Sequence, residues 1–384
     1  MKVLIAADSF KGSCTAEEAV SAMAQGVRAV FPNAETVELP VADGGEGTVC
    51  AMAAATGGRI VRAPAHDPLG RAIRAEYGIL PDGTAVIETA AASGLTLLRP
   101  EERDALRAST YGTGELIRHA LEHGAERVIL GLGGSATTDG GAGLAQALGV
   151  SLLDAAGREL PPGGAALQAL ARIDHTGVMP QAKHCRFLLA CDVRNQLCGT
   201  NGAAAVFGPQ KGADAEQVRL LDAALAHYAE VLRRQLGCDA AQREGSGAAG
   251  GLACAMLAFF DAVLCPGIDL VLDAVGFNAA LTGADLVLTG EGRLDAQSAG
   301  GKVPAGVARR VKAAGNVPVI AIGGAIGEGA DALYDCGVDA LVSAVSAVTT
   351  LEDAMKNAPA SIRESTARAM RLLRVGMGLK KNGA

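Results

Sequence analysis

The stretch that most constrains the fold runs from residue 128 to 143 and reads VILGLGGSATTDGGAG. It opens on a short apolar run that predicts a buried strand, passes through six glycines within thirteen residues, and ends in apolar residues at helical spacing. Such a strand, loop and helix can bring backbone N–H groups close to a phosphate, because glycine has no Cβ and a helix N-terminus favours an anion. The same layout also occurs in tight turns that bind nothing, and the spacing alone does not separate the two readings.

Length and composition favour a globular protein with two domains. The chain has 384 residues, of which 49% are hydrophobic and 20% are charged, and a chain of this length usually divides into more than one core. The net charge of −7 and the absence of Trp argue against a nucleic-acid partner, which needs a basic face and often aromatic stacking. An acidic protein can still bind anions through local donors and metal ions.

The cysteine pattern indicates the compartment. Nine cysteines are scattered along the chain without any Cys-x-x-Cys spacing, which is typical of reduced thiols and not of a disulfide framework or a zinc site. The sequence shows no signal-like leader and no apolar run long enough to cross a bilayer. We therefore expect a cytoplasmic protein without a membrane partner. The sequence leaves open whether the protein forms a homo-oligomer.

The two ends of the chain share one pattern and the middle has another. An alternating stretch at 73–77, bounded by turn residues, predicts antiparallel pairing in the middle. We predict an α/β fold in which residues 1–46 plus 279–384 form a parallel-sheet domain and residues 47–278 an inserted mixed α/β domain, with the active site in the cleft between them. The strands predicted for the terminal domain cover residues 3–7, 36–39, 285–289, 317–322 and 339–342, and the first of them is apolar throughout, as in a fully buried parallel strand.

Three polar loops, at 8–12, 43–48 and 290–295, follow predicted strands of the terminal domain. Because parallel strands share their carboxyl edge, these loops are expected to meet where open α/β sheets bind ligands. The first two have ordinary alternatives, since a loop lysine is commonly solvated and acidic residues commonly cap helices. The third combines two carboxylates and an arginine, which are costly to shield unless they meet a ligand, a metal or each other, so a merely structural role fits it least. The candidate side chains on these loops are Asp8, Ser9, Lys11, Asp43, Glu46, Glu291, Arg293 and Asp295.

Further candidates lie in the predicted inserted domain. Asp192 follows a predicted strand and could accept a proton from a substrate hydroxyl, although a capping role is the alternative. Lys211 stands in a glycine-bounded loop. The segment 245–250 matches Gly-x-Gly-x-x-Gly but follows no apolar strand, so we expect a flexible loop there and no dinucleotide site.

Taken together, the loops resemble those of the bacterial type I glycerate kinases. They occur in that family's order and cover nearly the whole chain. Two positions depart from the family pattern, because Thr138 stands where asparagine is expected and Gln196 where proline is expected. The matching segments are DSFKG at 8–12, ADGGEGT at 42–48, GGSAT at 133–137, DGG at 139–141, ACDV at 190–193, FGPQKG at 207–212, GG at 250–251 and GEGRLD at 290–295.

This resemblance implies a flavodoxin-like, Rossmann-like terminal domain with an inserted α/β domain. It also implies ATP-dependent phosphorylation of D-glycerate to 2-phosphoglycerate, with ATP and Mg²⁺ as cofactors. A glycerate 3-kinase, a kinase of another small hydroxy acid, and an anion-binding regulatory module without turnover are the alternatives.

The site roles are assigned on physical grounds, since phosphoryl transfer needs mainly positioning and charge neutralisation. The nucleotide phosphates are assigned to Gly133, Gly134, Ser135, Thr137 and Lys211. Glycerate is assigned to Asp8, Ser9, Lys11, Asp43 and Arg293, and Mg²⁺ to Asp43, Glu46 or Glu291. The catalytic assignments are Asp192 as first choice of base, Asp295 as second choice, and Lys11.

Overall fold

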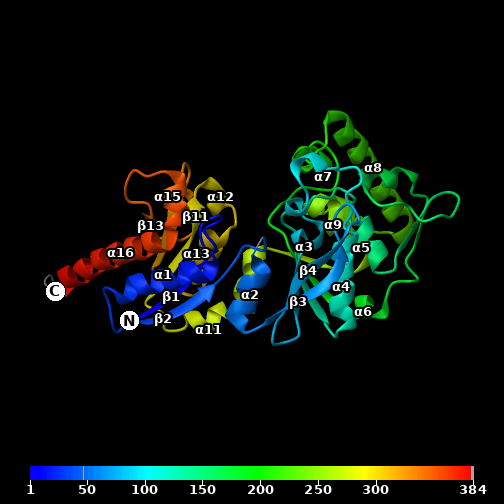
Figure 1. Ribbon diagram of the computed structural model, residues 1–384. Coiled ribbons are helices and arrows are strands. Elements are labelled where there is room, and N and C mark those ends of the chain that lie inside the picture. Colours follow the sequence, from blue (N-terminus) through cyan, green and yellow to red (C-terminus); the bar gives the residue numbers. More distant parts are fainter. Residues whose placement is uncertain (46, 382–384) are drawn as a thin grey trace. The chain divides into compact units, whose positions relative to one another are not determined.

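The computed structural model describes residues 1–45 and 47–381, and the chain divides into two compact units (Figure 1). Unit 1 combines Met1–Asp43, the short piece Ala54–Thr56 and the chain from Ile268 onward, whereas unit 2 comprises Gly44–Ala53 and Gly57–Gly267. The divisions therefore fall after residues 43 and 267, where the sequence placed them after 46 and 278. Among the described residues, no helix is both long and apolar enough to span a bilayer.

Unit 1 is built on a five-stranded parallel sheet with the strand order β13-β12-β11-β1-β2. In chain order this is the flavodoxin-like 2-1-3-4-5 arrangement expected from the sequence. The order reverses between β1 and β11, and ligands of open α/β sheets bind outside the carboxyl ends at such a reversal. The strands are β1 (Lys2–Ala7), β2 (Glu35–Pro40), β11 (Leu286–Leu294), β12 (Val319–Ile326) and β13 (Ala340–Ser343).

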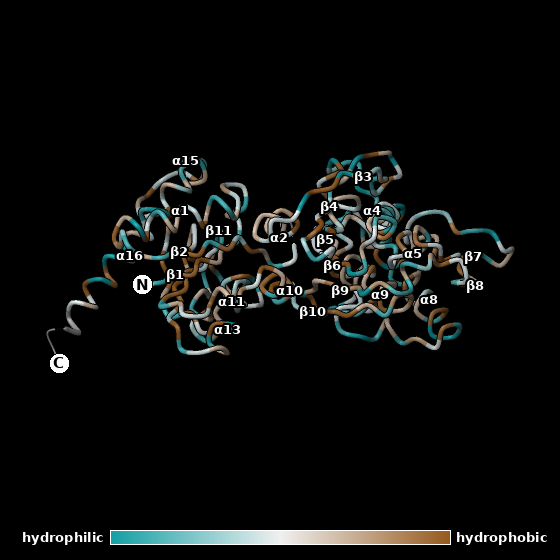
Figure 2. Tube along the Cα trace, turned by 90° about the horizontal axis from the view of Figure 1, so that it is seen from below, coloured by the Kyte–Doolittle hydropathy of each residue, from teal (hydrophilic) through white to brown (hydrophobic). Residues whose placement is uncertain are grey.

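Helices cover both faces of this sheet, with α1 and α16 on one face and α11 and α13 on the other (Figure 2). A capping box starts α1, with Thr15 and Glu18 bonded to each other's backbone N–H groups. The helices α1 and α16 cross closely at Gly26, where an added Cβ would lie 2.5 Å from the Arg363 carbonyl oxygen. The helices of unit 1 are α1 (Ala16–Arg28), α10 (Gly267–Ala274), α11 (Phe277–Leu281), α12 (Ala296–Ala299), α13 (Val303–Ala314), α14 (Ala332–Asp335), α15 (Leu351–Lys356) and α16 (Ala358–Lys381).

Unit 2 contains a six-stranded mixed sheet with the order β10-β9-β6-β5-β4-β3. The strands from β10 to β5 are parallel, while β3, β4 and β5 pair antiparallel, as the alternating pattern predicted. A small antiparallel pair, β7 (Ser151–Leu153) and β8 (Arg172–Asp174), is separate. The strands of the main sheet are β3 (Arg59–His66), β4 (Ala72–Ile79), β5 (Ala85–Glu88), β6 (Arg127–Gly131), β9 (Arg186–Ala190) and β10 (Val263–Cys265).

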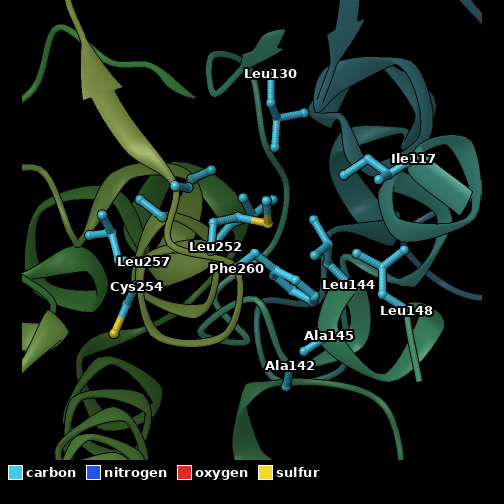
Figure 3. Packing of buried hydrophobic residues seen from close by; sticks show 14 of the residues in the cluster. Ile117, Leu130, Ala142, Leu144, Ala145, Leu148, Leu252, Cys254, Leu257 and Phe260 are labelled. Atoms are coloured by element: carbon cyan, nitrogen blue, oxygen red, sulfur yellow. The ribbon is translucent and has the colours of Figure 1, made fainter. Parts of the chain in front are cut away.

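The core of unit 2 forms where helices pack on this sheet. Leu130 of β6 is fully buried in one cluster with Ile117, Leu144 and Leu148, and Phe260 belongs to the same cluster (Figure 3). The helices are α2 (Thr48–Thr56, whose last turn is grouped with unit 1), α3 (Ala90–Ser93), α4 (Tyr111–Glu122), α5 (Ala142–Ala147), α6 (Pro180–His184), α7 (Ala203–Phe207), α8 (Ala215–Leu236) and α9 (Leu252–Phe259). The 3₁₀ turns are Leu95–Leu97, Pro100–Glu102, Gly164–Ala169, Pro209–Lys211, Ala240–Gln242 and Ala248–Gly251.

Two local predictions were wrong. The segment 290–294, predicted as a loop, continues β11, because it pairs in register with β12 as far as Leu294. The glycine-rich segment 245–250 is a packed part of the interior and not a flexible loop, since Ser246 is fully buried and its hydroxyl donates to the Ala241 carbonyl oxygen at 2.9 Å. In both places tertiary packing overrides the local preference of glycine for loops.

Candidate functional site

A pocket of about 410 Å³ lies in unit 1 at the carboxyl edge of its sheet. Residues following β1, β2 and β13 line it, together with the carboxyl-terminal parts of β11 and β12. The structure thus brings together seven of the candidates named from the sequence, and Glu46 lies outside the described residues. These seven are Asp8, Ser9, Lys11, Asp43, Glu291, Arg293 and Asp295.

Asp8 is the most perturbed acid of this pocket. It comes directly after β1, is only 4% exposed, and accepts hydrogen bonds from the Ser9 N–H at 2.6 Å and the Ser9 hydroxyl at 3.2 Å. Burial raises the pKa of its carboxyl to about 7, with Asp43 and Glu291 adding to the rise and Lys11 opposing it. A carboxyl group whose pKa is raised to near neutral pH by burial and neighbouring charges is typical of a functional site.

Glu291 is held inside β11, where its side chain points into the same pocket. The Ser298 hydroxyl donates to its Oε1. Burial raises the pKa of Glu291, and the Ser298 bond and the charge of Lys302 act against that rise. Lys302 was missed by sequence reasoning, and its signal would have been a lysine placed after two glycines just ahead of α13.

Asp295 lines the pocket and also caps a helix. It is the N-cap of α12, accepts a hydrogen bond from the Gln297 N–H at 2.9 Å, and pairs with Arg293 at 3.3 Å. This capping role was not expected from the sequence. Its carboxylate is already committed to two partners, which makes it less suited to remove a proton from a substrate.

The pocket has the donor chemistry for a hard cation without forming a complete cage. Among the described residues, no three His, Cys, Asp or Glu side chains are arranged to hold a metal ion by themselves. Mg²⁺ commonly binds through one or two carboxylates, with phosphate oxygens and water as its other ligands. Asp43 and Glu291 both line the pocket and fit that requirement.

In unit 2 the loop after β6 exposes only its first turn. Gly133 and Gly134 are exposed, and Gly134 adopts φ +73°, a conformation that favours glycine. Ser135 is 6% exposed, and Thr137 is fully buried with no hydrogen-bond partner for its hydroxyl among the described residues. The backbone of the two glycines, with Ser135, is therefore the part of this loop that can meet a phosphate.

Asp139 organises this loop from within. Its carboxylate is fully buried and accepts hydrogen bonds from the Thr110 N–H and hydroxyl, both at 2.8 Å, and from the N–H groups of Gly141 at 3.1 Å and Gly143 at 3.2 Å. Burial raises its pKa, and these four donors oppose the rise. The segment DGG at 139–141 was matched from the sequence, but Asp139 received no role there.

Lys211 supports the same loop from the buried side. Its ammonium group is buried and donates to the Thr137 carbonyl oxygen at 2.6 Å and to the Ser135 hydroxyl at 3.0 Å. Burial lowers its pKa to about 7, and Asp139 partly offsets this effect. In this structure Lys211 therefore supports the backbone of the loop, and the contact of Lys211 and Thr137 with phosphates stays a prediction.

Asp192 follows β9, the neighbour of β6 in the sheet, so it stands at the same edge as the glycine loop. Its carboxylate is exposed and accepts a hydrogen bond from the Gly267 N–H at 3.0 Å. The chain at Gly44 lies across this edge, because a Cβ on Gly44 would be 2.7 Å from the Ala190 Cβ and one on Gly131 would be 2.6 Å from the Gly44 carbonyl oxygen.

A Gly250→Ala variant should reveal how firmly the loop is supported. Gly250 has φ +67°, and a Cβ there would clash with the Thr137 carbonyl oxygen. We expect a loss of about 3 kcal/mol in the free energy of unfolding, measured by urea denaturation. Gly237→Ala, at φ +65° with open space around it, should cost only about 1 kcal/mol. Equal losses in the two variants would show that the contact with Thr137 is unimportant.

Comparisons with known proteins cover nearly the whole chain. Residues 3–374 match the model of the glycerate kinase family. The glycerate kinase of Bacillus subtilis (strain 168) is 51% identical over 369 residues, which are 96% of each chain. The glycerate 2-kinase of Escherichia coli (strain K12) is 47% identical over 378 residues, 98% of this chain and 99% of its own. A crystal structure from Salmonella typhimurium LT2, provisionally described as a glycerate kinase 2, matches with a TM-score of 0.88 at 48% identity, covering 98% of this chain and 99% of the other.

Proposed function

Because the chain belongs to the glycerate kinase family, and is therefore a phosphotransferase acting on a small molecule, we propose that it transfers the γ-phosphoryl group of ATP to D-glycerate and releases 2-phosphoglycerate. The observation that carries this proposal is the pocket of unit 1, where buried carboxylates and three cations line one cavity. Cations can bind the carboxylate of glycerate or a phosphate, and carboxylates can bind hydroxyl groups or a metal-bound phosphate.

The residues of unit 1 are proposed to position the acceptor. Lys11 and Arg293 would bind the glycerate carboxylate or the transferring phosphoryl group, since both line the pocket beside Asp8 and Ser9. Asp43 and Glu291 would hold Mg²⁺, which would supply positive charge to the phosphate oxygens. Glu46, the other candidate, lies outside the described residues.

In unit 2 we propose that Gly133, Gly134 and Ser135 receive phosphate oxygens of ATP. Asp192 is the proposed base for the acceptor hydroxyl, because its carboxylate is exposed at the same sheet edge. An aspartate is a weak base for an alcohol, but in a loose transition state the hydroxyl loses its proton late, so a weak base is sufficient. Asp295 becomes the weaker choice because it already caps α12.

Identification of the product tests this proposal directly. The chain is incubated with MgATP and D-glycerate, and the product is examined by ³¹P NMR. Phosphorus on the secondary hydroxyl couples to a single proton and gives a doublet, whereas phosphorus on the primary hydroxyl couples to two and gives a triplet. A doublet supports the 2-kinase, and a triplet would indicate a glycerate 3-kinase. A panel of other hydroxy acids tests a different acceptor, and binding without any turnover would favour the regulatory module.

A Gly134→Val variant tests the phosphate role of the glycine loop. Gly134 adopts φ +73°, so a branched side chain would both strain the backbone and block its approach to an anion. We expect the KM for ATP to rise about tenfold, which corresponds to about 1.4 kcal/mol of binding. Gly124→Val, at φ +91° in open space after α4, is the matched control for strain alone. An unchanged KM for ATP in the first variant would place the phosphates elsewhere.

A further inference from the structure

Two chemically different sets of residues line the pocket of unit 1, called here its polar half and its apolar half, and the proposed acceptor accounts for only one of them. The polar half contains the carboxylates and the cations Lys11, Arg293 and Lys302. The other half is apolar and comes from the segment after β13, from α15 and from the start of α16. Its lining residues are Phe10, Val345, Leu351, Ala354, Met355 and Ile362.

Glycerate cannot account for the apolar half. Every carbon of glycerate carries oxygen, so this acid gains little from contact with aliphatic side chains. The pocket volume of about 410 Å³ also falls within the range of roughly 300–1,000 Å³ that is typical of sites for larger ligands. The full cavity therefore suits a ligand with one anionic end and one flat or apolar end.

We propose that the apolar half of this pocket receives the base of the nucleotide, with the transferring phosphoryl group directed toward Lys11, Arg293 and Lys302. The inference rests on the proposed function, which requires a nucleoside triphosphate. An aromatic base has apolar faces for the aliphatic wall and polar edges for hydroxyl groups, and the side chains of Ser13 and Ser361 also line the cavity.

The loop after β1 joins the two halves. Phe10 belongs to the apolar wall and the next residue, Lys11, to the polar half. Gly12 has φ +75°, and a Cβ there would lie 2.7 Å from the Cε of Met355, so the loop passes directly beside α15. Met355 offers a polarisable thioether that packs favourably on aromatic rings. Leu351 is 77% exposed, which leaves apolar surface that a base can cover.

The test compares MgADP with magnesium pyrophosphate, which lacks the nucleoside, by isothermal titration calorimetry on the full chain. In the double variant Leu351→Ser/Met355→Ser we expect affinity for ADP to fall about tenfold while affinity for pyrophosphate stays within about twofold. The KM for ATP should rise in parallel, and the KM for glycerate should not change. Leu372→Ser is the matched control, because Leu372 is 75% exposed on α16 and does not line the pocket.

Three results for the double variant would overturn this assignment. The first two are an unchanged affinity for ADP and an equal fall in the affinities for ADP and pyrophosphate. The third is a rise in the KM for glycerate alone, which would indicate that the apolar half binds a larger acceptor. If the double variant does not fold, Leu351→Ser carries the test, since that side chain is mostly exposed. A wild-type chain that binds ADP but does not phosphorylate glycerate would refute the proposed function and leave the binding test valid. Absence of ADP binding would refute the base site itself.

Discussion

Replacement of Asp192 by asparagine is expected to lower kcat by about 10²–10⁴-fold, the range found when a positioned acid or base is removed. The fold should persist, because an asparagine Oδ1 can still accept the hydrogen bond that the Gly267 N–H now donates at 3.0 Å. The variant can no longer take up the proton of the acceptor hydroxyl, because an amide is not a base at neutral pH. The measurement is glycerate-dependent release of ADP, together with the melting temperature, which should stay near that of the wild type.

Asp82→Asn is the matched control for this experiment. Asp82 is an exposed aspartate of unit 2 that also accepts a backbone hydrogen bond, from the Thr84 N–H at 2.9 Å, in the turn between β4 and β5. Its replacement should leave kcat unchanged because it is remote from the sheet edge that carries Asp192. If Asp192→Asn retained more than about a tenth of wild-type turnover, its loss would fall below that expected for a general base. Asp8 would then become the first candidate.

The parts predicted well from the sequence are those with a strong local signal. The apolar run that became β1 could be found because a strand buried on both faces must be apolar throughout, and all residues of β1 after Lys2 are buried. The glycine loop after β6 could be found because its residue types are unusual. The charged end of β11 could not, because its strand conformation depends on pairing with β12, which lies more than twenty residues further along the chain.

The residue types that line the pocket could be predicted from the sequence, whereas their roles stay predictions. Lys11 and Arg293 do line one pocket, but Lys211 is buried behind its loop, and a lysine that supports a backbone has the same local sequence as one that binds phosphate. The apolar wall formed by Leu351 and Met355 gave no signal, because apolar residues at helical spacing look alike whether they face a core or a ligand. Such distinctions depend on contacts between distant segments.

An Asp8→Asn variant is expected to be more stable than the wild type above neutral pH. The pKa of the Asp8 carboxyl rises from 3.8 to about 7 on folding, because the group is buried beside Asp43. Between these two pH values the unfolded chain has lost the proton while the folded chain keeps it, so the free energy of unfolding falls as pH rises through this window. Above pH 7 the accumulated cost is on the order of 4 kcal/mol. Asparagine avoids it and can still accept the Ser9 N–H.

Urea denaturation at pH 4 and at pH 8, with a chelator present, measures this effect. The free energy of unfolding of Asp8→Asn should exceed that of the wild type by at least about 2 kcal/mol at pH 8 and by almost nothing at pH 4. Asp82→Asn should instead be less stable than the wild type at pH 8. The backbone hydrogen bond from Thr84 lowers the pKa of Asp82, so its carboxylate stabilises the fold above that pKa. A variant that is more stable yet turns over glycerate poorly would show that the buried charge serves the reaction at the expense of stability. Equal free energies of unfolding for Asp8→Asn and the wild type at pH 8 would mean that Asp8 ionises in the folded protein without a loss of stability. Burial would then not hold its carboxyl group in a perturbed state for ligand binding.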